Sequence, residues 1–552
     1  MPTKFYDLSG SGALRSARNL SRRNFIKVMG FSLTTMITGF WSYFRFFKSN
    51  KYFFSGSLVG ANSKTGHLLQ SGVKAIPTET KTLDTVIVGG GISGLSAAWW
   101  FKKNNFKDFV LFEMDSDVGG NSMSGSNSIS KYPWGAHYVP LPGPEAHYVR
   151  EFFEEIGIIQ GYQKGLPIFN EYYLCSDAQE RLFFQGEWQE GLVPQHGIQH
   201  DDKRQYDEFF TFIESLKKKK GVDKKYVFSI PLDSSSQDPE YLKLDLISMS
   251  EFMREKGWNS SYLNWYVNYC CRDDYGRPHN KVSAWAGLHY FASRAGVGAN
   301  ADAQSVLTWP EGNGFLVSKF KEIIGDHIRR NSLVFSIECL SQGYSVDVLN
   351  TQDNSCTRYF VKNVIFCGPR FTANKIIKDY SSDRTLEYAP WAIANMTIKE
   401  FPLSQGAPLS WDNVSFYSKS LGYIVANHQD LKFNRKEKVI TYYLPLDEKP
   451  PKEERIAAYQ KSYQDWLDII IPDLEKMHPG ISRTVLNVDV WIWGHGMVSP
   501  GINYLWSPKR KDFLKPFKGI EFAHSDMSGI SIFEEAQYRG VEAAKRILSK
   551  LI

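Results

Sequence analysis

The sequence predicts an α/β fold, and three observations support this. The apolar run Val86–Val88 is typical of a buried parallel strand. Three glycines follow it with the spacing G-x-G-x-x-G and open an apolar, helix-forming stretch: Gly89, Gly91 and Gly94. A second strand, 109–112, ends in Glu113, about 20 residues beyond the glycine turn. Strand, glycine turn, helix, strand and acid in this order predict a Rossmann-like dinucleotide-binding domain.

Each part of this pattern has a physical task. The first glycine permits the tight turn, the second lets the backbone approach a pyrophosphate, and the third lets helix and strand pack closely. The helix that begins near Ser93 directs its free N–H groups and positive dipole end at the phosphates. Glu113 is placed to accept a hydrogen bond from a ribose hydroxyl. A lone G-x-G-x-x-G also fits an ordinary glycine turn, but the complete order favours dinucleotide binding.

Length and composition indicate a globular protein of two or more domains. The chain has 552 residues, too many for one small core, with 42% hydrophobic and 22% charged residues. Aromatic residues make up 15%, which suits a large apolar pocket or a thick core equally well. The net charge of +6 is small for this length, and the lysine run 217–220 is typical of a solvated surface. We therefore predict no nucleic-acid partner.

The N-terminus carries an export pattern. Residues 21–27, Ser-Arg-Arg-Asn-Phe-Ile-Lys, resemble the twin-arginine motif, and the uncharged, moderately apolar run 28–44 is short for a membrane span. The alternative is a chance arginine pair before a membrane helix. We predict export by the twin-arginine machinery, to the periplasm or to the outer face of the inner membrane if the segment is retained as an anchor. Residues 1–61 are then signal or anchor outside the fold, with a cleavage candidate at 59–61, and 62–81 form a linker.

The cysteines predict no metal centre. None of them has the spacing of a metal-ligand set: Cys175, Cys270, Cys271, Cys339, Cys356 and Cys367. Cys270 and Cys271 are adjacent, which permits a redox-active pair, but small buried residues are the favoured interpretation.

Further patterns lie at both ends of the chain. Glu113 is followed by Gly119-Gly120-Asn121 and by Trp134-Gly135-Ala136-His137-Tyr138. Two further segments are Thr308–Gly314, with a proline and two glycines before an expected helix, and the apolar strand before Pro369. Near the C-terminus, 519–526 is a strand ending in an acid, and 532–544 is a helix. Together these segments resemble the flavin-dependent amine oxidase and phytoene-desaturase superfamily, and the resemblance implies FAD as the cofactor.

The resemblance also implies which residues bind FAD. The main chain of Val334 would contact the adenine, Asp526 a ribityl hydroxyl, and the N–H of Phe533 the flavin N1 and C2=O edge. Asn121 stands where the superfamily usually has arginine, and Ser525 and Glu535 replace glycines. The full predicted set is Gly89, Gly91, Ser93, Gly94, Glu113, Gly119, Gly120, Asn121, Gly135, Ala136, His137, Val334, Asp526 and Phe533.

With the resemblance, the predicted fold is a discontinuous, Rossmann-like FAD-binding domain with an inserted α+β substrate domain. The FAD-binding domain is expected at 82–150, 306–378 and 487–552. The substrate domain is expected at 151–305 and 379–486, with one helix over 453–471 on its apolar spacing.

The substrate domain holds the candidate pocket residues. The aromatic run 265–276 with Asp273 and Asp274, followed by His289, fits an acidic substrate wall that attracts a cationic amine, or an aromatic core helix. In many amine oxidases a lysine holds a water against flavin N5, but Asn395 or Met396 stands at the aligned place, which weakens the case for amine oxidation. The catalytic residues therefore stay open; the candidates are His137, Asn395 and Trp493, with Trp491 and His495 as further pocket residues.

The predicted function is that of an exported, amine-oxidase-like FAD oxidoreductase. A hydride would pass from a substrate C–H to flavin N5. One alternative is a desaturase or isomerase of a hydrophobic polyene or lipid, and another is a flavin-binding assembly protein without turnover. The partner is thus a small molecule, an amine or a hydrophobic compound. Substrate, electron acceptor, flavin attachment, signal cleavage and oligomeric state are not determined by the sequence.

Overall fold

The computed structural model describes residues 52–60, 62–381, 386–430 and 435–550. The chain divides into two units, Met1–Phe53 and Phe54–Ile552, and all elements below belong to the second. The twin-arginine segment 21–27 and the apolar run 28–44 lie outside the described residues. In the part that is described, no helix is both long enough and apolar enough to cross a membrane.

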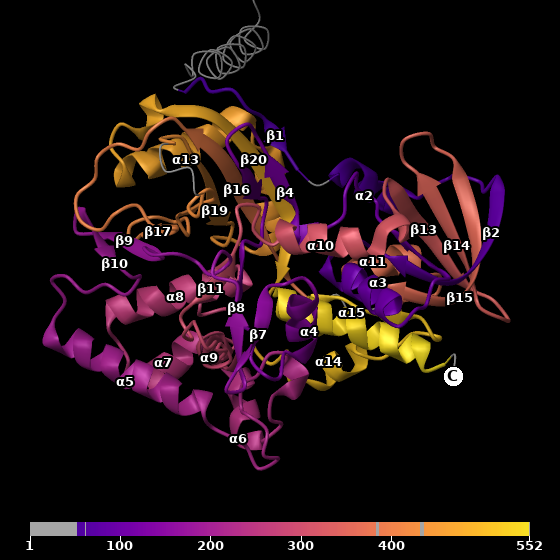
Figure 1. Cartoon of the computed structure of the whole chain (residues 1–552), viewed down its shortest axis with the longest axis horizontal. Coiled ribbons are helices and arrows are strands. Elements are labelled where there is room, and N and C mark those ends of the chain that lie inside the picture. Colours follow the sequence, from indigo (N-terminus) through magenta and orange to yellow (C-terminus); the bar gives the residue numbers. More distant parts are fainter. Residues whose placement is uncertain (1–51, 61, 382–385, 431–434, 551–552) are drawn as a thin grey trace, which may run out of the picture. The chain divides into compact units, whose positions relative to one another are not determined.

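A mostly parallel sheet forms the centre of the nucleotide-binding domain (Figure 1). Its strands lie in the order β12 (Ile328–Arg329), β3 (Phe109–Phe112), β2 (Glu79–Val88), β15 (Cys356–Phe366), β14 (Tyr344–Asn350) and β13 (Ser332–Cys339), and β21 (Glu521–Phe522) also pairs with β15. The strands β12, β3, β2, β15 and β21 run parallel, whereas β13, β14 and β15 are antiparallel. β2 is buried from Asp84 to Val88, which explains its unbroken apolar run.

Three helices pack on this sheet: α3 (Ile92–Lys103), α10 (Gly314–Ile324) and α15 (Phe533–Leu548). α15 crosses α3 closely, because a Cβ at Gly540 would lie 2.1 Å from the carbonyl oxygen of Ser93. Phe320 of α10 stacks on Phe152, with ring centroids 4.0 Å apart, in the core beside Trp99. Since the strands and helices come from three separate stretches of chain, the domain is discontinuous, as the sequence predicts.

A second, mixed sheet forms the centre of the inserted domain. In the described chain it has eight strands, in the order β1 (Leu58–Val59), β20 (Val485–Val498), β16 (Tyr388–Ile398), β19 (Lys438–Pro445), β18 (Tyr423–Val425), β17 (Asp412–Ser415), β9 (Glu180–Phe184) and β10 (Glu187–Glu190). β16 is buried along its whole length. A group of helices belongs to the same domain (Figure 1), and one of them, α8, packs against the sheet, since its Tyr269 shares a core with Leu182 and Val414: α5 (His200–Lys217), α7 (Met249–Glu255), α8 (Ser261–Tyr275) and α9 (Ala284–Ala292).

The N-terminal boundary differs from the sequence prediction. β1 pairs in parallel with β20, and the Ser57 N–H donates to the Asp489 carboxylate at 3.0 Å, so this stretch belongs to the fold and the prediction that all of 1–61 lies outside it is wrong. The expected linker 62–81 contains α2 (Ser63–Ser71) and the start of β2. The side chain of Asn62 caps α2, because it accepts a hydrogen bond from the Thr65 N–H. A cap of this kind is easily overlooked in the sequence of a short polar segment.

Two elements in the second half of the chain also differ. The helix expected over 453–471 is two helices, α12 (Pro451–Gln460) and α13 (Tyr463–Met477). Ser462 starts the second one, because it forms a capping box with Asp465. β20 begins at Val485 and pairs with β16, so the start of the expected third FAD-binding segment at 487 belongs to the mixed sheet.

Candidate cofactor and substrate site

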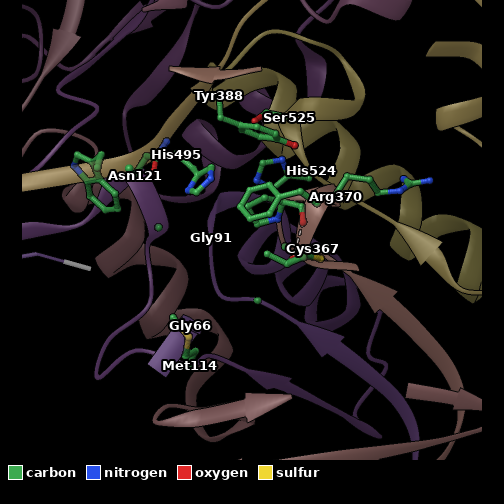
Figure 2. A pocket seen from close by; sticks show the side chains of 18 of the residues that line it. Gly66, Gly91, Met114, Asn121, Cys367, Arg370, Tyr388, His495, His524 and Ser525 are labelled. Carbon is green, nitrogen blue, oxygen red and sulfur yellow. Dashed lines mark hydrogen bonds between the residues drawn. The ribbon is translucent and has the colours of Figure 1, made fainter. Parts of the chain in front are cut away.

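A cavity of about 1190 Å³ opens at the carboxyl ends of β2, β3 and β15 (Figure 2). Val88, Glu113 and Cys367, at or just after these strand ends, form part of its wall. In doubly wound folds, nucleotides bind in the crevice beyond the carboxyl ends of the parallel strands. Ligand pockets commonly measure roughly 300–1,000 Å³, so this cavity has room for a dinucleotide and part of a second molecule.

The glycine turn is built to bring backbone to this cavity. Gly89 has a φ of +103°, which favours glycine, and it lies against Cys367. A Cβ on Gly94 would lie 1.9 Å from the Gly89 carbonyl oxygen, so this glycine lets helix and turn pack together. A Cβ on Gly91 would meet no atom within 4 Å, because Gly91 faces the open cavity. α3 has no side-chain cap, so its first N–H groups are available to an anion.

Glu113 is held in place at the end of β3. Its two carboxylate oxygens accept hydrogen bonds from the Gly90 N–H at 2.7 Å and the Asp115 N–H at 2.8 Å. Burial raises the pKa of Glu113 to about 7, even though these hydrogen bonds act in the opposite direction. The carboxyl therefore lies at a fixed position in the wall, ready to accept from a ribose hydroxyl.

The structure brings most of the predicted FAD-binding residues into one wall. The lining includes Gly89, Gly91, Ser93, Glu113, Gly119, Gly120, Asn121, Ala136, Val334 and Phe533. Four predicted residues do not line the cavity: Gly94, Gly135, His137 and Asp526. Gly94 and Gly135 instead permit close backbone packing, since a Cβ on Gly135 would lie 2.3 Å from the Asn121 carbonyl oxygen.

Asp526 is placed differently from the expected ribityl contact. It is fully buried, and its carboxylate accepts from the Tyr388 hydroxyl at 2.6 Å and the Arg370 N–H at 2.8 Å. The pKa of Asp526 lies below its usual value. Burial acts to raise this pKa, but the charge of His524 and these hydrogen bonds outweigh the effect of burial. Its neighbours His524 and Ser525 line the cavity instead. The Asp526 carboxylate thus lies behind the cavity wall and holds Tyr388 and Arg370, which line it.

The start of α15 also faces the cavity. Ile532 and Phe533 belong to the lining, and α15 has no side-chain cap at its N-terminus. Its free N–H groups and positive dipole end can therefore stabilise negative charge in a bound group.

The three catalytic candidates have different surroundings. His137 packs among Tyr138, Trp411 and Tyr443, and burial lowers its pKa to about 4, so its imidazole is neutral at physiological pH. Asn395 is buried in β16, where its amide donates to the Pro133 carbonyl at 2.9 Å and accepts from the Thr441 hydroxyl at 2.6 Å. Trp493 lines the cavity. Of the three, Trp493 alone is part of the cavity wall.

Trp493 and the segment before His137 are joined directly. The Trp493 indole N–H donates to the Trp134 carbonyl at 2.6 Å. His495, one of the further pocket candidates, also lines the cavity, whereas Trp491 is packed against Trp134 and Trp493 without lining it.

Several lining residues have no signal in the sequence. They come from α2, α11 (Arg370–Ile376), α12 and the start of β16: Asn62, Ser63, Gly66, His67, Leu69, Gln70, Arg370, Phe371, Lys375, Tyr388, Lys452, Arg455 and Tyr459. These segments lie far from the glycine turn in the chain, so no local spacing connects them with it.

An acidic and aromatic cluster includes Tyr138, which follows the lining residue Ala136 by two positions, although Tyr138, Tyr269, Asp273 and Asp412 do not themselves line the cavity. Tyr138 donates to Asp273 at 3.4 Å, and Tyr269 donates to Asp412 at 3.4 Å. Burial, and then the charge of Asp274, raises the pKa of Asp273 to about 7. Burial, and then the charges of Glu180 and Asp273, raises the pKa of Asp412. These carboxyls repel one another, and the guanidinium of Arg294, which donates to the Tyr138 hydroxyl at 3.0 Å, already offsets part of this repulsion at Asp273.

The other members of the aromatic run have structural partners. Asp274 forms an ion pair with Arg294, and His289 bonds the Ser229 carbonyl at 2.9 Å. Cys270 and Cys271 are buried free thiols, and burial raises the pKa of both. The run is therefore a core helix, α8, of which Asp273 and Tyr269 reach the acidic and aromatic cluster.

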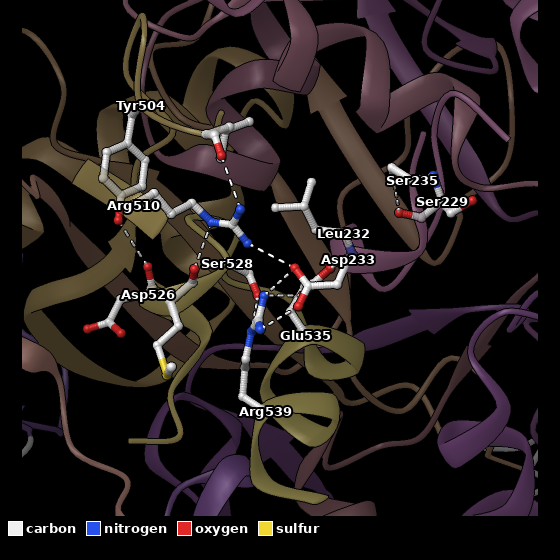
Figure 3. Close-up of polar contacts among 12 residues, drawn as sticks. Ser229, Leu232, Asp233, Ser235, Tyr504, Arg510, Asp526, Ser528, Glu535 and Arg539 are labelled. Atoms are coloured by element: carbon white, nitrogen blue, oxygen red, sulfur yellow. Dashed lines mark hydrogen bonds and ion pairs between the residues drawn. The ribbon is translucent and has the colours of Figure 1, made fainter. Parts of the chain in front are cut away.

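A polar network anchors α15 to the inserted domain (Figure 3). Glu535, at a glycine position of the superfamily, accepts from the Leu232 N–H and the Ser528 hydroxyl. Arg539 donates to both oxygens of Asp233, at 2.7 and 2.9 Å, and Arg510 reaches the same carboxylate at 3.1 Å. Burial raises the pKa of Asp233, but the two guanidinium groups outweigh it and lower the pKa.

Comparisons with known proteins agree with this arrangement. A family model described as an NAD(P)-binding Rossmann-like domain matches residues 87–156. The flavin-containing amine oxidase of Oncorhynchus mykiss is 22% identical over 298 residues, covering 53% of this chain and 51% of that protein. Flavin-containing amine oxidase A of Bos taurus is 22% identical over 288 residues, covering 51% and 49%. The chain thus spans about half the length of the curated relatives it matches.

Solved structures are similar over most of the chain. Putrescine oxidase bound to putrescine has a TM-score of 0.61 at 16% identity, covering 85% of this chain and 100% of that one. Cyclohexylamine oxidase from Brevibacterium oxydans has a TM-score of 0.60 at 13% identity, covering 85% and 99%. The fold prediction is confirmed. A fatty acid isomerase from P. acnes shares the fold as well, with a TM-score of 0.57 at 14% identity over 84% of this chain and 98% of that one.

Proposed function

We propose that this protein is an FAD-dependent oxidoreductase of the amine-oxidase-like type. The observation that carries the proposal is a cavity onto which two helices open without a side-chain cap, α3 and α15. Uncapped N–H groups and helix dipoles stabilise negative charge. The glycine turn before α3 fits a pyrophosphate, and the start of α15 fits the ring that becomes negatively charged when a flavin is reduced.

Bound FAD would supply a hydride acceptor for a substrate C–H bond. The chain's own groups would hold and orient the cofactor. The backbone at Gly91 and Ser93 would hold the phosphates, and the Glu113 carboxylate would accept from a ribose hydroxyl. The N–H groups at Phe533 would stabilise charge at the far end. Trp493 and Ala136 line the cavity between these two ends, and they would help to exclude water from the reacting bond.

An amine is the substrate class that we propose first. In support, Tyr138, Asp273, Tyr269 and Asp412 form an acidic and aromatic cluster beside the wall segment that ends at Ala136. Aromatic faces and carboxylates both stabilise an ammonium group. The similarity to flavin-containing amine oxidases supports the same class.

The test is an absorption spectrum of the purified protein, followed by anaerobic titration with a series of amines. We expect flavin bands that bleach when an amine is added. Flavin bands that no amine bleaches would exclude amine oxidation and direct attention to hydrophobic polyenes and lipids. A colourless protein that does not take up FAD would refute the proposed function.

We also propose export by the twin-arginine route, with the sequence 21–27 as its sole support. Replacing Arg22 and Arg23 by lysine should retain the protein in the cytoplasm, as measured by cell fractionation of a tagged full-length chain. Unchanged delivery of the double variant would contradict this proposal. The same experiment, with mass spectrometry of the mature N-terminus, would show whether the segment is cleaved before β1.

A further inference from the structure

The cavity extends beyond the part that the nucleotide-binding pattern explains. α12 and β20 contribute Lys452, Arg455 and His495 to its wall, and α2 contributes His67. We refer to these four side chains as the basic lobe. In Figure 2, His495 and Met114 lie on opposite sides of Gly91. His495 therefore lies away from the end of the cavity that Glu113 and Met114 mark as the ribose end, whereas α2, which carries His67, passes beside that end, since a Cβ on Gly66 would lie 3.8 Å from Met114 Sδ.

Arg455 reaches the lobe because β20 has a glycine at position 494. A Cβ there would lie 2.6 Å from the Tyr459 hydroxyl oxygen and 3.1 Å from Arg455 Cδ, so a larger residue would displace both side chains. Gly494 follows Trp493, whose indole N–H donates to the carbonyl of Trp134, two residues before the lining residue Ala136. The guanidinium thus enters the cavity beside Trp493, in the wall between the glycine turn and the start of α15.

The guanidinium of Arg455 has unused hydrogen-bonding capacity. It donates to the Gly494 carbonyl at 2.6 Å, and no carboxylate among the described residues forms an ion pair with it. Burial lowers the pKa of Arg455, since the charge is partly removed from water without an acidic partner. A guanidinium has donors in a planar fork, so most of them remain free for an anion with two oxygens.

The other groups of the lobe do not neutralise this charge. Burial, and then the positive charges of Arg455 and His67, lowers the pKa of His495 to about 3. Lys452 is exposed at the rim. The carboxylate Glu387 lies in the same wall but forms an ion pair with Arg277 at 2.5 Å. The lobe therefore carries net positive charge toward the cavity.

We propose that Arg455 binds a carboxylate of the substrate, so that the oxidised compound is a carboxylate-bearing amine such as an amino acid. This inference rests on the proposed function and deepens it. Arginine and carboxylate pair through two parallel N–H···O bonds, which fix orientation as well as affinity. A substrate held by its carboxylate at Arg455 would lie beside Trp493, which lines the same cavity.

Binding can be tested apart from turnover by using benzoate as the probe and the full-length, FAD-loaded protein. We expect benzoate to perturb the flavin absorption bands in a saturable manner and benzyl alcohol, its uncharged analogue, to leave them unchanged. Arg455→Met should weaken benzoate binding by about tenfold or more, and Arg455→Lys should restore part of it. Arg435→Met is the matched control, because Arg435 is also half-buried and donates to a backbone carbonyl, that of Ile129, outside the cavity.

The substrate preference provides the second arm. Anaerobic flavin reduction is compared for pairs that differ by the carboxylate, such as phenylalanine and phenethylamine. We expect the amino acid to reduce the flavin faster and Arg455→Met to abolish that preference. A preference for the amine without a carboxylate in the natural protein would overturn the inference.

Two outcomes separate this inference from the proposed function. Equal benzoate affinity in the natural protein and Arg455→Met, or loss of FAD in Arg455→Met, would overturn the carboxylate assignment, the latter because it would assign the guanidinium to the pyrophosphate. Absence of bound flavin in the natural protein would instead refute the oxidoreductase. Urea unfolding midpoints of all variants identify any loss of binding that is caused by misfolding.

Discussion

Replacing Gly91 by alanine should separate cofactor binding from folding. Gly91 has φ −70° and ψ −179°, a conformation open to any residue, and a Cβ there would meet no atom within 4 Å. We therefore expect the unfolding free energy of the apoprotein to change by less than about 0.5 kcal/mol. The added methyl group enters the cavity where the backbone would meet the pyrophosphate. Loss of one hydrogen bond to a charged group costs about 1.5–3 kcal/mol, or roughly a 10- to 100-fold weaker FAD affinity.

The assay combines urea unfolding of the apoprotein with FAD titration followed by flavin fluorescence. Gly94→Ala is the matched control, because its Cβ would lie 1.9 Å from the Gly89 carbonyl oxygen. That variant should lose about 1–3 kcal/mol of stability through overpacking. The reasoning would be refuted if Gly91→Ala bound FAD with unchanged affinity, or if it unfolded as readily as Gly94→Ala.

Three further predictions concern other parts of the molecule. Asp233→Ala leaves the buried Arg510 and Arg539 without their carboxylate, so it should lower the unfolding free energy by about 3 kcal/mol. As a control, Lys378→Met breaks the exposed Lys378–Glu338 pair and should lower the unfolding free energy by at most about 1 kcal/mol. Urea unfolding measures both changes. Glu113 keeps its proton in the folded state up to about pH 7 and releases it near pH 4.5 when unfolded, so the unfolding free energy of the apoprotein should fall by about 1.4 kcal/mol per pH unit between these values, and Glu113→Gln should remove that contribution. The thiols of Cys270 and Cys271 should resist iodoacetamide at pH 8 until urea unfolds the protein, as measured by mass spectrometry; modification of the folded protein would contradict their burial.

Most of the residues that the sequence assigned to FAD line the same cavity, and short-range spacing is the reason. The turn at Gly89–Gly94 and the acid Glu113 belong to one βαβ unit, so short-range spacing determines where they lie. The discontinuous α/β fold followed from the second pattern at the C-terminus, which the superposition with solved oxidases confirms. The predicted single helix at 453–471 was wrong because the capping box at Ser462 was not recognised.

The surroundings of Asp526 could not be predicted from the spacing of residues in the sequence. Its place after β21 could be read from the sequence, but its neighbours could not. Tyr388 and the Arg370 N–H come from distant segments and use its carboxylate, leaving His524 and Ser525 to face the cavity. Such partners are decided by packing between elements, which a local pattern does not encode.

The sequence by itself determined the α/β fold class and the glycine turn, because both follow from the backbone needs of residues close together in the chain. The tertiary structure decided what else surrounds the cavity. β20 brings Gly494 beside α12, and the space left by the missing side chain admits Arg455. It also placed β1 and α2 within the fold, through pairing with β20 and through the capped turn at Asn62. The pairing of β1 with β20 joins residues more than 400 positions apart, and Gly494 and Arg455 lie in different elements, so only packing in three dimensions could reveal these two contacts.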